Sequence, residues 1–534
     1  MSLKKTIISA GLLVSTLEAT ANYVSFDVTK NKNSPKIHEK RSSDGDLNFI
    51  IENEQSYYSV ELVIGSDKQK LTALLDTGSS DLWVLGETAA GLDACDAYLE
   101  SAGYLTSSKK ATSSSSSVKE EISDVQANCV DLGTYSPSSS SSFKKEHASD
   151  PFEIQYGDLT FADGYWASDS LTVNGVAVDG LLFGVAESSN SSNVCGISFP
   201  YLESSDEEVV SSVAPFTYAN LPQLLKNDGL INKVAYSLFL NSFSASSGDL
   251  LFGGVDTAKY TGTLSTIPLV NIYSSYYSNP IEFDVTLQGT GFYSSDGSYT
   301  TYNDQYFAAL FDSGTTLLVL PQDLADMFAA SVNAEWDNDV GFYTLECPSS
   351  DVADESAYVF QFGGVNYYIP LSNYILQTSS SSTCYLGVQP SDDQQCIIGD
   401  NTLSSLYVVY DMDDYQISLA QANYEGASES SIEIIESAIP GAEQAPGYSK
   451  TWTQTVAEIT SGGDIFSGSK PTNPWAKRDV KTLKKRDSSG NSTSTLSTVA
   501  TSASSNTSAT SVSSKNGASL LSFSIAAVIV ALIF

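Results

Sequence analysis

The sequence predicts a mostly β protein built from two similar lobes that an approximate twofold axis relates. Between residues 46 and 424, short β-type segments such as YYSVELVIG and LYVVYD alternate with turns rich in Gly, Asn, Asp and Ser. Helix-like periodicity is scarce there, and residues 321–332 (PQDLADMFAASV) are the clearest exception. The twofold relation comes from an internal repeat, because residues 73–80 read ALLDTGSS and residues 309–316 read ALFDSGTT.

A second motif follows each copy of the repeat. Two apolar residues and a glycine stand at 194–196 after the first copy and at 397–399 after the second. The interval is longer in the first half, which indicates an insertion there. We expect an N-terminal lobe at 42–235 and a C-terminal lobe at 236–424.

Composition excludes several classes of function. The 534 residues include 26 Lys and Arg against 63 Asp and Glu, a net charge of −37 that repels nucleic acid phosphates. Only two histidines are present: His38 lies in a segment interpreted below as removed, and His147 lies in a polar stretch (SSSFKKEHASD) typical of a solvated loop. Ser/His/Asp triads and His-rich zinc sites therefore have at most one histidine to work with. Chemistry must rest on carboxylates, hydroxyls or the backbone, and we expect no nucleic acid partner, metal or cofactor.

The N-terminal segments predict export and processing. Residues 1–21 carry two early lysines, an apolar run and the small residues Ala19-Thr20-Ala21, the pattern of a cleaved secretory signal. The dibasic pair Lys40-Arg41 follows shortly before the β-rich region, so residues 22–41 are interpreted as a pro-segment. The alternative for this pair is a surface charge cluster.

The insertion occupies about 86–150. It is polar and rich in serine, with little capacity to pack, and it contains two lysine pairs, Lys109-Lys110 and Lys144-Lys145. Because exposed flexible loops are preferred sites of cleavage, we expect nicking into two chains there. The alternative is that glycans shield the loop.

The C-terminal segments predict a tether. Residues 425–515 lose the β-type alternation and end in a Ser/Thr-dominated stretch that suits a glycosylated stalk. Residues 516–534 fit a GPI attachment signal, with Asn516 as the anchor site before an apolar tail; a plain membrane helix is the alternative. We therefore expect a protein at the cell surface, on the plasma membrane or in the cell wall. Three sequons predict N-glycans, at Asn190, Asn491 and Asn506.

The repeat points to a carboxylate pair. Each copy delivers an aspartate at the end of an apolar strand, and the glycine after it lets the backbone turn tightly. A twofold axis would bring Asp76 and Asp312 to one shared water. Because two carboxylates at short range cannot both ionise cheaply, the pair would hold one proton and could activate that water against a peptide carbonyl.

At these motifs the sequence resembles the pepsin-like aspartic proteases, and more narrowly the yapsin-type, GPI-anchored fungal aspartyl proteases. The resemblance implies a bilobed pepsin-like fold with the cleft between the lobes, and Asp76 and Asp312 as catalytic residues. It also implies that neighbouring residues line the cleft, orient the active-site loops or bond the carboxylates, namely Gly78 and Gly314, Thr77 and Ser313, and Ser79 and Thr315.

The resemblance further implies a flap over the cleft. Residues 154–158 (IQYGD) match it, so Tyr156, Gly157 and Asp158 would contact substrate, and Trp83 matches the tryptophan that supports the flap tyrosine. An acidic residue at Asp158 favours Lys or Arg on the amino side of the cleaved bond. The alternative is that Asp158 only caps the flap turn.

Six cysteines in an exported protein favour disulfides. Cys95 and Cys129 bracket part of the insertion and are predicted to pair, as are Cys347 and Cys384 in the second lobe. Cys195 and Cys396 stand beside the apolar-apolar-Gly motifs, where a buried free thiol and a bridge are both open.

We therefore expect a monomeric aspartic endopeptidase that acts on secreted and cell-surface proteins or peptides with basic cleavage sites. Two alternatives remain at this point. One is a glycosidase with a carboxylate pair, which would need acid and base on dissimilar loops, whereas this pair is symmetric. The other is a non-catalytic wall protein on the same scaffold, although both aspartate motifs are intact.

Overall fold

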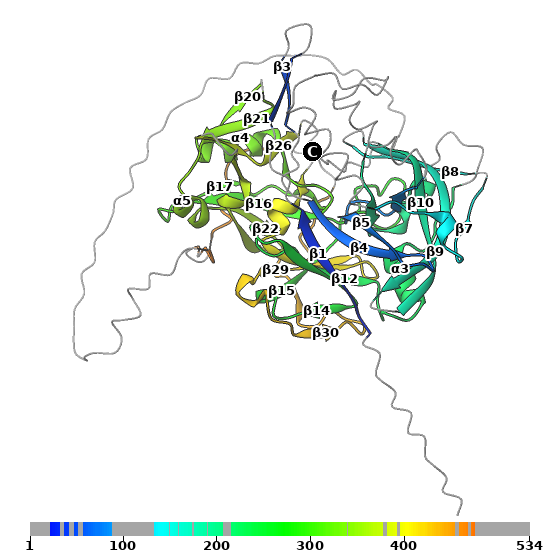
Figure 1. Cartoon of the computed structure of the whole chain (residues 1–534). Helices are drawn as coiled ribbons and strands as arrows, with labels where there is room; N and C mark the ends of the chain where they lie inside the picture. The colour runs from blue at the N-terminus through cyan, green and yellow to red at the C-terminus, as the bar shows by residue number, and fades with distance from the viewer. Residues whose placement is uncertain are drawn as a thin grey trace, which may run out of the picture.

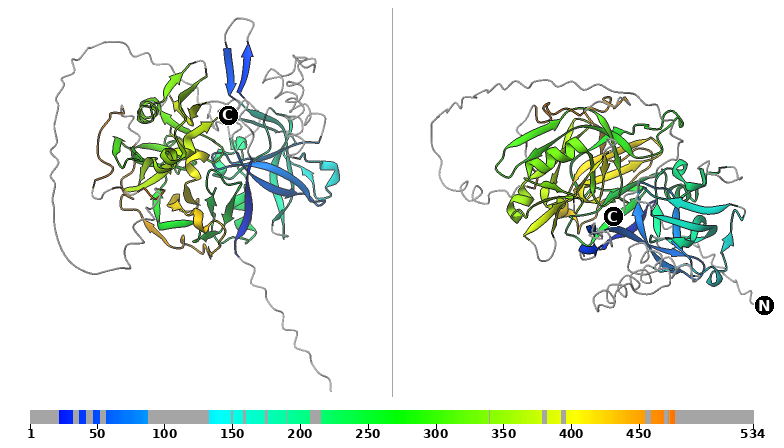
Figure 2. Two further views of the ribbon diagram at one scale, coloured as in Figure 1. Left: turned by 60° about the vertical axis from the view of Figure 1, so that its left-hand side comes forward. Right: turned by 90° about the horizontal axis from the view of Figure 1, so that it is seen from above.

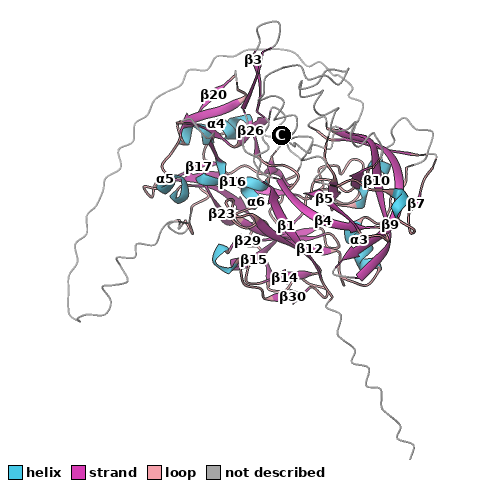
Figure 3. Cartoon of the chain, in the orientation of Figure 1, coloured by secondary structure: helices cyan, strands magenta, loops and turns pink. Residues whose placement is uncertain are grey.

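The computed structural model confirms a mostly β, two-lobed molecule, with the N-terminal lobe in blue to cyan and the C-terminal lobe in green to orange (Figure 1). Helices are short and lie among the strands (Figure 3). The structure describes residues 22–31, 37–41, 47–51, 57–87, 133–148, 150–157, 160–173, 176–189, 191–206, 215–338, 340–377, 382–391, 396–453, 459–467, 471 and 473–475.

The largest sheet of the described part of the chain has 15 strands and runs through both lobes. Its order, with β8 (Pro151–Gln155) added at β9, is β31 (Ala442–Gln444), β15 (Tyr260–Pro268), β29 (Gln416–Ala422), β28 (Leu406–Asp411), β12 (Ala235–Phe239), β13 (Ser247–Phe252), β1 (Val24–Asn31), β4 (Tyr57–Ile64), β5 (Gln69–Asp76), β11 (Val194–Gly196), β6 (Leu82–Leu85), β10 (Val176–Ser189), β9 (Phe161–Val173) and β7 (Lys144–Lys145).

A second sheet, with 8 described strands, forms the C-terminal lobe. Its order, with β17 (Tyr299–Asn303) added at β16, is β23 (Val365–Pro370), β22 (Ala357–Phe362), β16 (Asp284–Tyr293), β18 (Phe307–Phe311), β27 (Ile397–Ile398), β19 (Leu318–Pro321) and β26 (Val388–Ser391).

Smaller sheets and helices complete the described fold. The strands are β20 (Glu335–Asp337), β21 (Phe342–Glu346), β25 (Thr383–Leu386) and β24 (Ile375–Gln377) in one sheet, β14 (Gly254–Asp256) with β30 (Ile432–Ile434), and β2 (Ile37–Arg41) with β3 (Leu47–Ile51). The helices are α3 (Leu221–Asn227), α4 (Gln322–Ser331), α5 (Ser350–Glu355) and α6 (Asp400–Leu403), with 3₁₀ turns η1 (Pro137–Ser139), η2 (Pro200–Leu202), η3 (Ser204–Asp206), η4 (Leu371–Tyr374) and η5 (Tyr424–Gly426).

Sequence patterns explain why these segments adopt their structures. In β4, Tyr58, Val60, Leu62 and Ile64 alternate with more polar positions and are all buried, as a strand with one core face requires. The segment predicted as a helix forms α4, whose buried residues recur at helical spacing: Leu324, Ala325, Phe328 and Ala329.

Strand β1 connects the two lobes. It pairs with β4 on one side, where Val28 lies opposite Val60, and with β13 on the other, where Phe26 lies opposite Leu250. Figure 2 shows it between the lobes in both views. The predicted pro-segment therefore contributes a central strand to the described fold, and the dibasic pair at its end lies on β2.

Part of the predicted insertion is packed, contrary to expectation. Tyr135 is fully buried, and its hydroxyl donates to Asp169 at 2.5 Å. Lys144 and Lys145 form β7, whose backbone pairs with β9. The reason is that two aromatic residues, Tyr135 and Phe143, anchor a serine-rich segment to the core. Lys109-Lys110 lies outside the described residues.

The predicted start of the stalk at 425 also needs correction, because the fold continues to Trp475. Strand β30 pairs with β14, β31 pairs with β15 at the edge of the 15-stranded sheet, and Ile465 and Phe466 are buried against the lobe. The indole of Trp475 stacks on Tyr424, with ring centroids 4.7 Å apart, and donates to the carbonyl of Tyr368 at 2.8 Å. A few apolar residues spaced through a polar segment are enough to hold it against the lobe. We call residues 425–475 the C-terminal strap.

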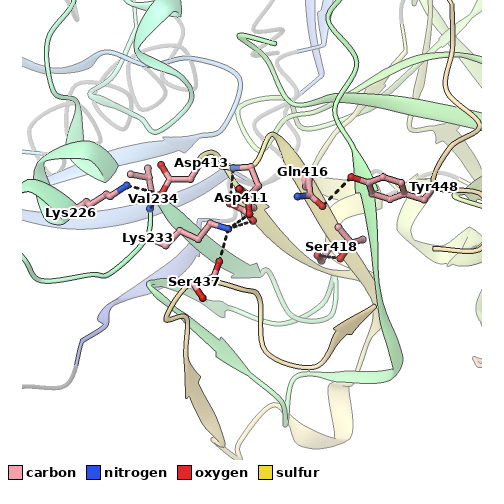
Figure 4. A network of polar contacts seen from close by, with 11 residues as sticks. Lys226, Lys233, Val234, Asp411, Asp413, Gln416, Ser418, Ser437 and Tyr448 are labelled. Atoms are coloured by element: carbon pink, nitrogen blue, oxygen red, sulfur yellow. Dashed lines mark hydrogen bonds and ion pairs between the residues drawn. The ribbon is translucent and has the colours of Figure 1, made fainter. Parts of the chain in front are cut away.

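A buried ion network fixes the turn between β28 and β29. The ammonium of Lys233 donates to Asp411 at 2.6 Å, to Asp414 at 2.5 Å and to the carbonyl of Ser437 at 3.2 Å (Figure 4). The last residue of this turn, Tyr415, stacks on Phe199 from the other half of the chain, with ring centroids 5.6 Å apart. The network thus stabilises a contact between the halves.

The predicted disulfide between Cys347 and Cys384 is confirmed, with an S–S distance of 2.07 Å. Cys195 and Cys396 are buried and free. Within the described ranges, no helix has the length and apolar composition needed to cross a membrane. Several predicted features lie outside those ranges: the signal segment 1–21, the GPI signal, Cys95, Cys129, Asp158, Asn190, Asn491, Asn506 and Asn516.

Candidate active site

Two matching strand ends bring the predicted carboxylates together. Asp76 ends β5, and Asp312 directly follows β18. The apolar pairs of the two apolar-apolar-Gly motifs lie on short strands beside the aspartate strands. β11 pairs in parallel with β5, and β27 pairs in parallel with β18. The amide of Ile197 donates to the carbonyl of Asp76 at 2.9 Å, and the amide of Asp312 donates to the carbonyl of Ile398 at 3.2 Å. Each aspartate is therefore held by two strands.

Each carboxylate receives the same two hydrogen bonds. One oxygen of Asp76 accepts from the amide of Gly78 at 2.7 Å, and the other accepts from the hydroxyl of Ser79. One oxygen of Asp312 accepts from the amide of Gly314 at 2.8 Å, and the other from the hydroxyl of Thr315 at 2.6 Å. These bonds fix both side chains before any substrate arrives.

Thr77 and Ser313 join the two loops. The hydroxyl of Thr77 donates to the carbonyl of Phe311 at 3.0 Å, and that of Ser313 donates to the carbonyl of Leu75 at 2.9 Å. In return, the amide of each residue donates to the hydroxyl of the other, at 3.2 Å from Thr77 and 2.9 Å from Ser313. All four bonds are buried and cross between the halves of the chain.

The loops approach so closely that only glycine fits beside the carboxylates. A Cβ atom on Gly78 would lie 2.6 Å from an oxygen of Asp312, and one on Gly314 would lie 2.5 Å from an oxygen of Asp76. Real Cβ atoms do not come that near without displacing a neighbour. The two carboxylates thus face each other across the two glycines.

Burial and the charge of one carboxyl on the other raise the pKa values of the two aspartates to different extents. Burial raises the pKa of Asp76, although bonds from Ser79, Asp312 and Gly78 oppose the rise. The pKa of Asp312 is raised well above its usual value by burial and then by the charge of Asp76. The two carboxyls therefore bind one proton between them, and the larger rise in pKa falls on Asp312.

The predicted flap tyrosine lies in a hairpin next to this pair. Tyr156 stands between β8 and β9, and its amide donates to the carbonyl of Thr160 at 2.8 Å. The indole N–H of Trp83 donates to the Tyr156 hydroxyl at 2.8 Å, and both side chains are buried. Gly157 follows at the turn. The charge of Asp76 contributes to the raised pKa of Tyr156, after burial, so the phenol stays neutral close to the carboxylates.

Sequence reasoning missed one acid in the same motif. Asp81 is fully buried, and its carboxylate accepts from the amide of Ser204 and from the hydroxyl of Tyr218, each at 2.7 Å. Burial raises its pKa to about 6 despite these bonds. Its position in DTGSSDLW, two residues before Trp83, was the available signal.

This arrangement can polarise a water between a carboxylate and a carboxylic acid, with no metal ligand set required. Among the described residues, no group of three or more His, Cys, Asp or Glu side chains is arranged to hold a metal. A symmetric pair at the junction of two lobes suits attack on an extended chain that crosses between them.

Comparison with known proteins agrees with this geometry. Residues 57–422 match the family model described as eukaryotic aspartyl protease. The chain is 41% identical to aspartic proteinase yapsin-3 of Saccharomyces cerevisiae over 83% of this chain and 81% of that protein. It is 40% identical to aspartic proteinase 3 of the same yeast, over 81% of each chain.

More distant relatives share the same architecture. Secreted aspartic protease 9 of Candida albicans is 32% identical over 79% of this chain and 89% of that protein. The crystal structure of an aspartic proteinase from Irpex lacteus, 19% identical, aligns with a TM-score of 0.50 over 70% of this chain and 96% of its own, which supports the fold. The chain therefore belongs to the eukaryotic aspartyl protease family, as an aspartic endopeptidase of the yapsin type.

Proposed function

We propose that Asp76 and Asp312 are the catalytic pair of this endopeptidase and that they activate one water between them. The observation that carries the proposal is the symmetric cross-linking of the two aspartate loops by Thr77 and Ser313. It fixes two carboxyl groups of unequal acidity side by side, which is what a shared-water mechanism requires.

In the proposed reaction, Asp76 accepts a proton from the water as its oxygen attacks the peptide carbonyl carbon. Asp312 donates its proton to the carbonyl oxygen, so the tetrahedral intermediate carries no net charge there. When the C–N bond breaks, Asp76 gives its proton to the leaving nitrogen and Asp312 regains one from the hydroxyl that becomes a carbonyl. The pair ends in its starting state.

Active-site titration of the purified protein tests this proposal. A statine-containing peptide inhibitor imitates the tetrahedral intermediate, and we expect it to abolish peptide cleavage at one equivalent per chain. A glycosidase would not be titrated in this way, and a non-catalytic wall protein would have no activity to lose. Peptide cleavage that persists at excess inhibitor would contradict the proposed site.

We propose in addition that the enzyme prefers Lys or Arg on the amino side of the cleaved bond. Asp158 stands two residues after the flap tyrosine, and the net charge of −37 favours the approach of basic peptides. The test is Asp158→Thr with matched Lys and Leu peptides. The ratio of their kcat/KM values should fall sharply, and an unchanged ratio would leave Asp158 only as a cap of the flap turn.

The chain's terminal segments support a surface-attached enzyme. We propose a cleaved signal at 1–21, a pro-segment at 22–41, N-glycans, and a GPI anchor at Asn516. A chain stopped at Lys515 should be released into the medium in active form, and phosphatidylinositol-specific phospholipase C should release the full-length protein from membranes. Truncated protein that stays cell-bound would contradict the anchor.

Nicking of the insertion remains a proposal for Lys109-Lys110, whereas Lys144-Lys145 is paired in β7 and is a poor protease site. If Cys95 and Cys129 form the second disulfide, the two fragments of the monomer stay joined until they are reduced. Electrophoresis with and without reductant decides the matter. A single full-length band under reducing conditions would rule out the cut.

A further inference from the structure

The carboxylate of Asp81 holds two segments of the N-terminal lobe together. It is fully buried, and it accepts from the amide of Ser204 in one segment and from the hydroxyl of Tyr218 in the other, each at 2.7 Å. The two segments are residues 203–206 and 215–218, and we call them the arms. We call Asp81 with its two partners the clasp.

The arms are also bonded to each other. The amide of Phe216 donates to the carbonyl of Ser205 at 3.0 Å, and the hydroxyl of Ser205 donates to the carbonyl of Phe216 at 2.7 Å. The amide of Tyr218 donates to the carboxylate of Glu203 at 2.8 Å. The two arms therefore form one unit, and Asp81 joins this unit to the loop that follows Asp76.

The backbone of Asp81 is fixed from the opposite side. Its carbonyl accepts from the amide of Gly196 at 3.0 Å, and a Cβ atom on Gly196 would lie 2.7 Å from that carbonyl oxygen. Gly196 lies opposite Asp76 in the parallel pairing of β11 with β5. The strand pair that holds Asp76 therefore also fixes the position of Asp81.

Tyr218 connects the clasp to the flap. Its ring packs edge-on against Trp166, with ring centroids 5.4 Å apart, and Trp166 packs edge-on against Phe152, with ring centroids 5.0 Å apart. Phe152 lies on β8, the strand that leads to Tyr156, and both belong to the apolar cluster against which Tyr218 packs. A continuous series of contacts thus runs from Asp81 to the first strand of the flap.

The charge of Asp81 decides how strongly the clasp holds. An ionised carboxylate accepts on both oxygens, and hydrogen bonds to a charged acceptor are about twice as strong as those between neutral groups. A protonated Asp81 must donate from one oxygen. The backbone amide of Ser204 cannot turn away, whereas the hydroxyl of Tyr218 can rotate, so protonation changes the bond to Tyr218.

The groups that face Asp81 leave it as the member of the clasp that changes charge. Burial raises the pKa of Asp81 to about 6, although its two hydrogen bonds oppose the rise. Burial and then the charges of Asp81 and Glu203 raise the pKa of Tyr218 well above its usual value. Tyr156, whose pKa is raised by burial and by the charge of Asp76, also faces Asp81. Both phenols therefore stay neutral while Asp81 ionises between pH 4 and pH 7.

We propose that Asp81 is a positioning residue of this enzyme: its ionised carboxylate closes the clasp and, through Tyr218, holds the first strand of the flap in the position that substrate binding requires. Asp81 acts through Tyr218 and not on the proton transfer between Asp76 and Asp312, so its effect falls on KM more than on kcat. The inference rests on the proposed catalytic pair and flap.

Asp81→Asn tests the clasp, because asparagine is neutral at every pH, like the protonated acid. Cleavage of one peptide by the full chain at pH 4 and pH 7 gives KM and kcat. We expect the variant to match the wild-type KM at pH 4 and to raise it roughly 5- to 10-fold at pH 7, where a charge-assisted bond is lost, with kcat changed less than about twofold.

Tyr218→Phe removes the other partner and keeps the ring. We expect it to raise KM at pH 7 by a similar factor and at pH 4 by less. At pH 7 the double variant Asp81→Asn, Tyr218→Phe should be no worse than either single variant, because both remove the same bond. If Asp81→Asn fails to fold, the pH dependence of KM in Tyr218→Phe decides the matter.

Asp169→Asn is the matched control. Asp169 also accepts from a buried tyrosine of the same lobe, the hydroxyl of Tyr135 at 2.5 Å. Against the effect of burial, hydrogen bonds from Ser142 and Tyr135 lower the pKa of Asp169, so it is largely ionised at both pH values. The ratio of the KM of Asp169→Asn to the wild-type KM should therefore be the same at pH 4 and pH 7.

Titration with the statine-containing inhibitor counts the folded active sites of every variant. A KM ratio of Asp81→Asn to wild type that is equal at the two pH values would overturn the clasp, and so would additive effects of Asp81→Asn and Tyr218→Phe at pH 7. If the inhibitor titrates wild-type cleavage and the KM ratio stays constant, the clasp alone fails. If the inhibitor does not titrate wild-type cleavage, the proposed catalytic pair fails and the clasp fails with it.

Discussion

Thr77 and Ser313 each donate a hydroxyl hydrogen to the backbone carbonyl that precedes the other's aspartate, at 3.0 Å to Phe311 and 2.9 Å to Leu75. The two residues stand 236 positions apart in the sequence. Because the bonds cross in both directions, each hydroxyl ties one aspartate loop to the strand that carries the other aspartate. These hydrogen bonds between hydroxyl groups and the backbone therefore fix the relative position of the two carboxyl groups.

Removing one hydroxyl should loosen this junction. Thr77→Val leaves two buried partners without a bond, and we expect a loss of about 2 kcal/mol in the free energy of unfolding. Misplacement of the carboxyls should lower kcat roughly 10- to 100-fold. Thr266→Val is the control, since Thr266 shares a buried hydroxyl contact with Ser418 at 2.8 Å away from the site. Equal effects of both variants on kcat would show that the junction has no special role.

The bond from Trp83 to Tyr156 should contribute to transition-state binding through the flap. Trp83→Phe keeps an aromatic ring but removes the N–H, and we expect kcat/KM to fall about tenfold. In a double-mutant cycle with Tyr156→Phe, the coupling energy should reach about 1 kcal/mol. Trp166→Phe, in the same aromatic cluster, should be additive with Tyr156→Phe. If the effects of Trp83→Phe and Tyr156→Phe were also additive, the bond between the two side chains would not contribute to transition-state binding.

Stability should fall as pH rises through the range in which Asp81 titrates. The folded pKa of Asp81 is raised to about 6 by burial, so the folded state binds a proton more tightly than the unfolded state between the unfolded pKa and that value. By linkage, this one group makes the protein less stable at pH 7 than at pH 4, by about 2 kcal/mol. The buried acids Asp76, Asp312 and Asp284 act in the same direction.

Urea unfolding at a series of pH values measures this effect. Asp81→Asn should make the difference in unfolding free energy between pH 4 and pH 7 smaller by about 2 kcal/mol, since the asparagine does not titrate. A stability profile that rises from pH 4 to pH 7 in the wild type would contradict the sign of the shift.

The C-terminal strap should stabilise the lobe that it covers. Trp475→Ala removes the stack on Tyr424 and the bond to Tyr368, and we expect it to cost about 2 kcal/mol and to lower Tm. Trp336→Ala is the control, because Trp336 is 39% exposed, and should cost less than about 1 kcal/mol. An unchanged Tm for Trp475→Ala would place the strap outside the cooperative fold.

The repeat was sufficient to predict the two lobes and the meeting of Asp76 with Asp312. An apolar strand that ends in D-T-G or D-S-G is a pattern of a few consecutive residues, so it can be recognised in the sequence. The similarity of the two copies indicates the twofold relation between the lobes directly. Trp83 and Tyr156 followed from their place in the family pattern, and the structure joins them by a hydrogen bond.

Prediction from the sequence failed where a few apolar residues anchor a segment that is otherwise polar. Tyr135 in a serine-rich stretch and Trp475 in the strap each pack onto a surface that only the folded lobe presents, so composition averaged over a segment hides them.

The most direct test of the account is the activity of Asp76→Asn and Asp312→Asn, each compared with Asp256→Asn, a buried aspartate that bonds the amides of Ala258 and Ser431 away from the site. If the two acids share one water, each site variant should lose at least about 10²- to 10⁴-fold in kcat while it stays folded, because each removes one half of the proton transfer. Asp256→Asn should retain activity. A tenth of wild-type turnover in either site variant would contradict the shared-water mechanism.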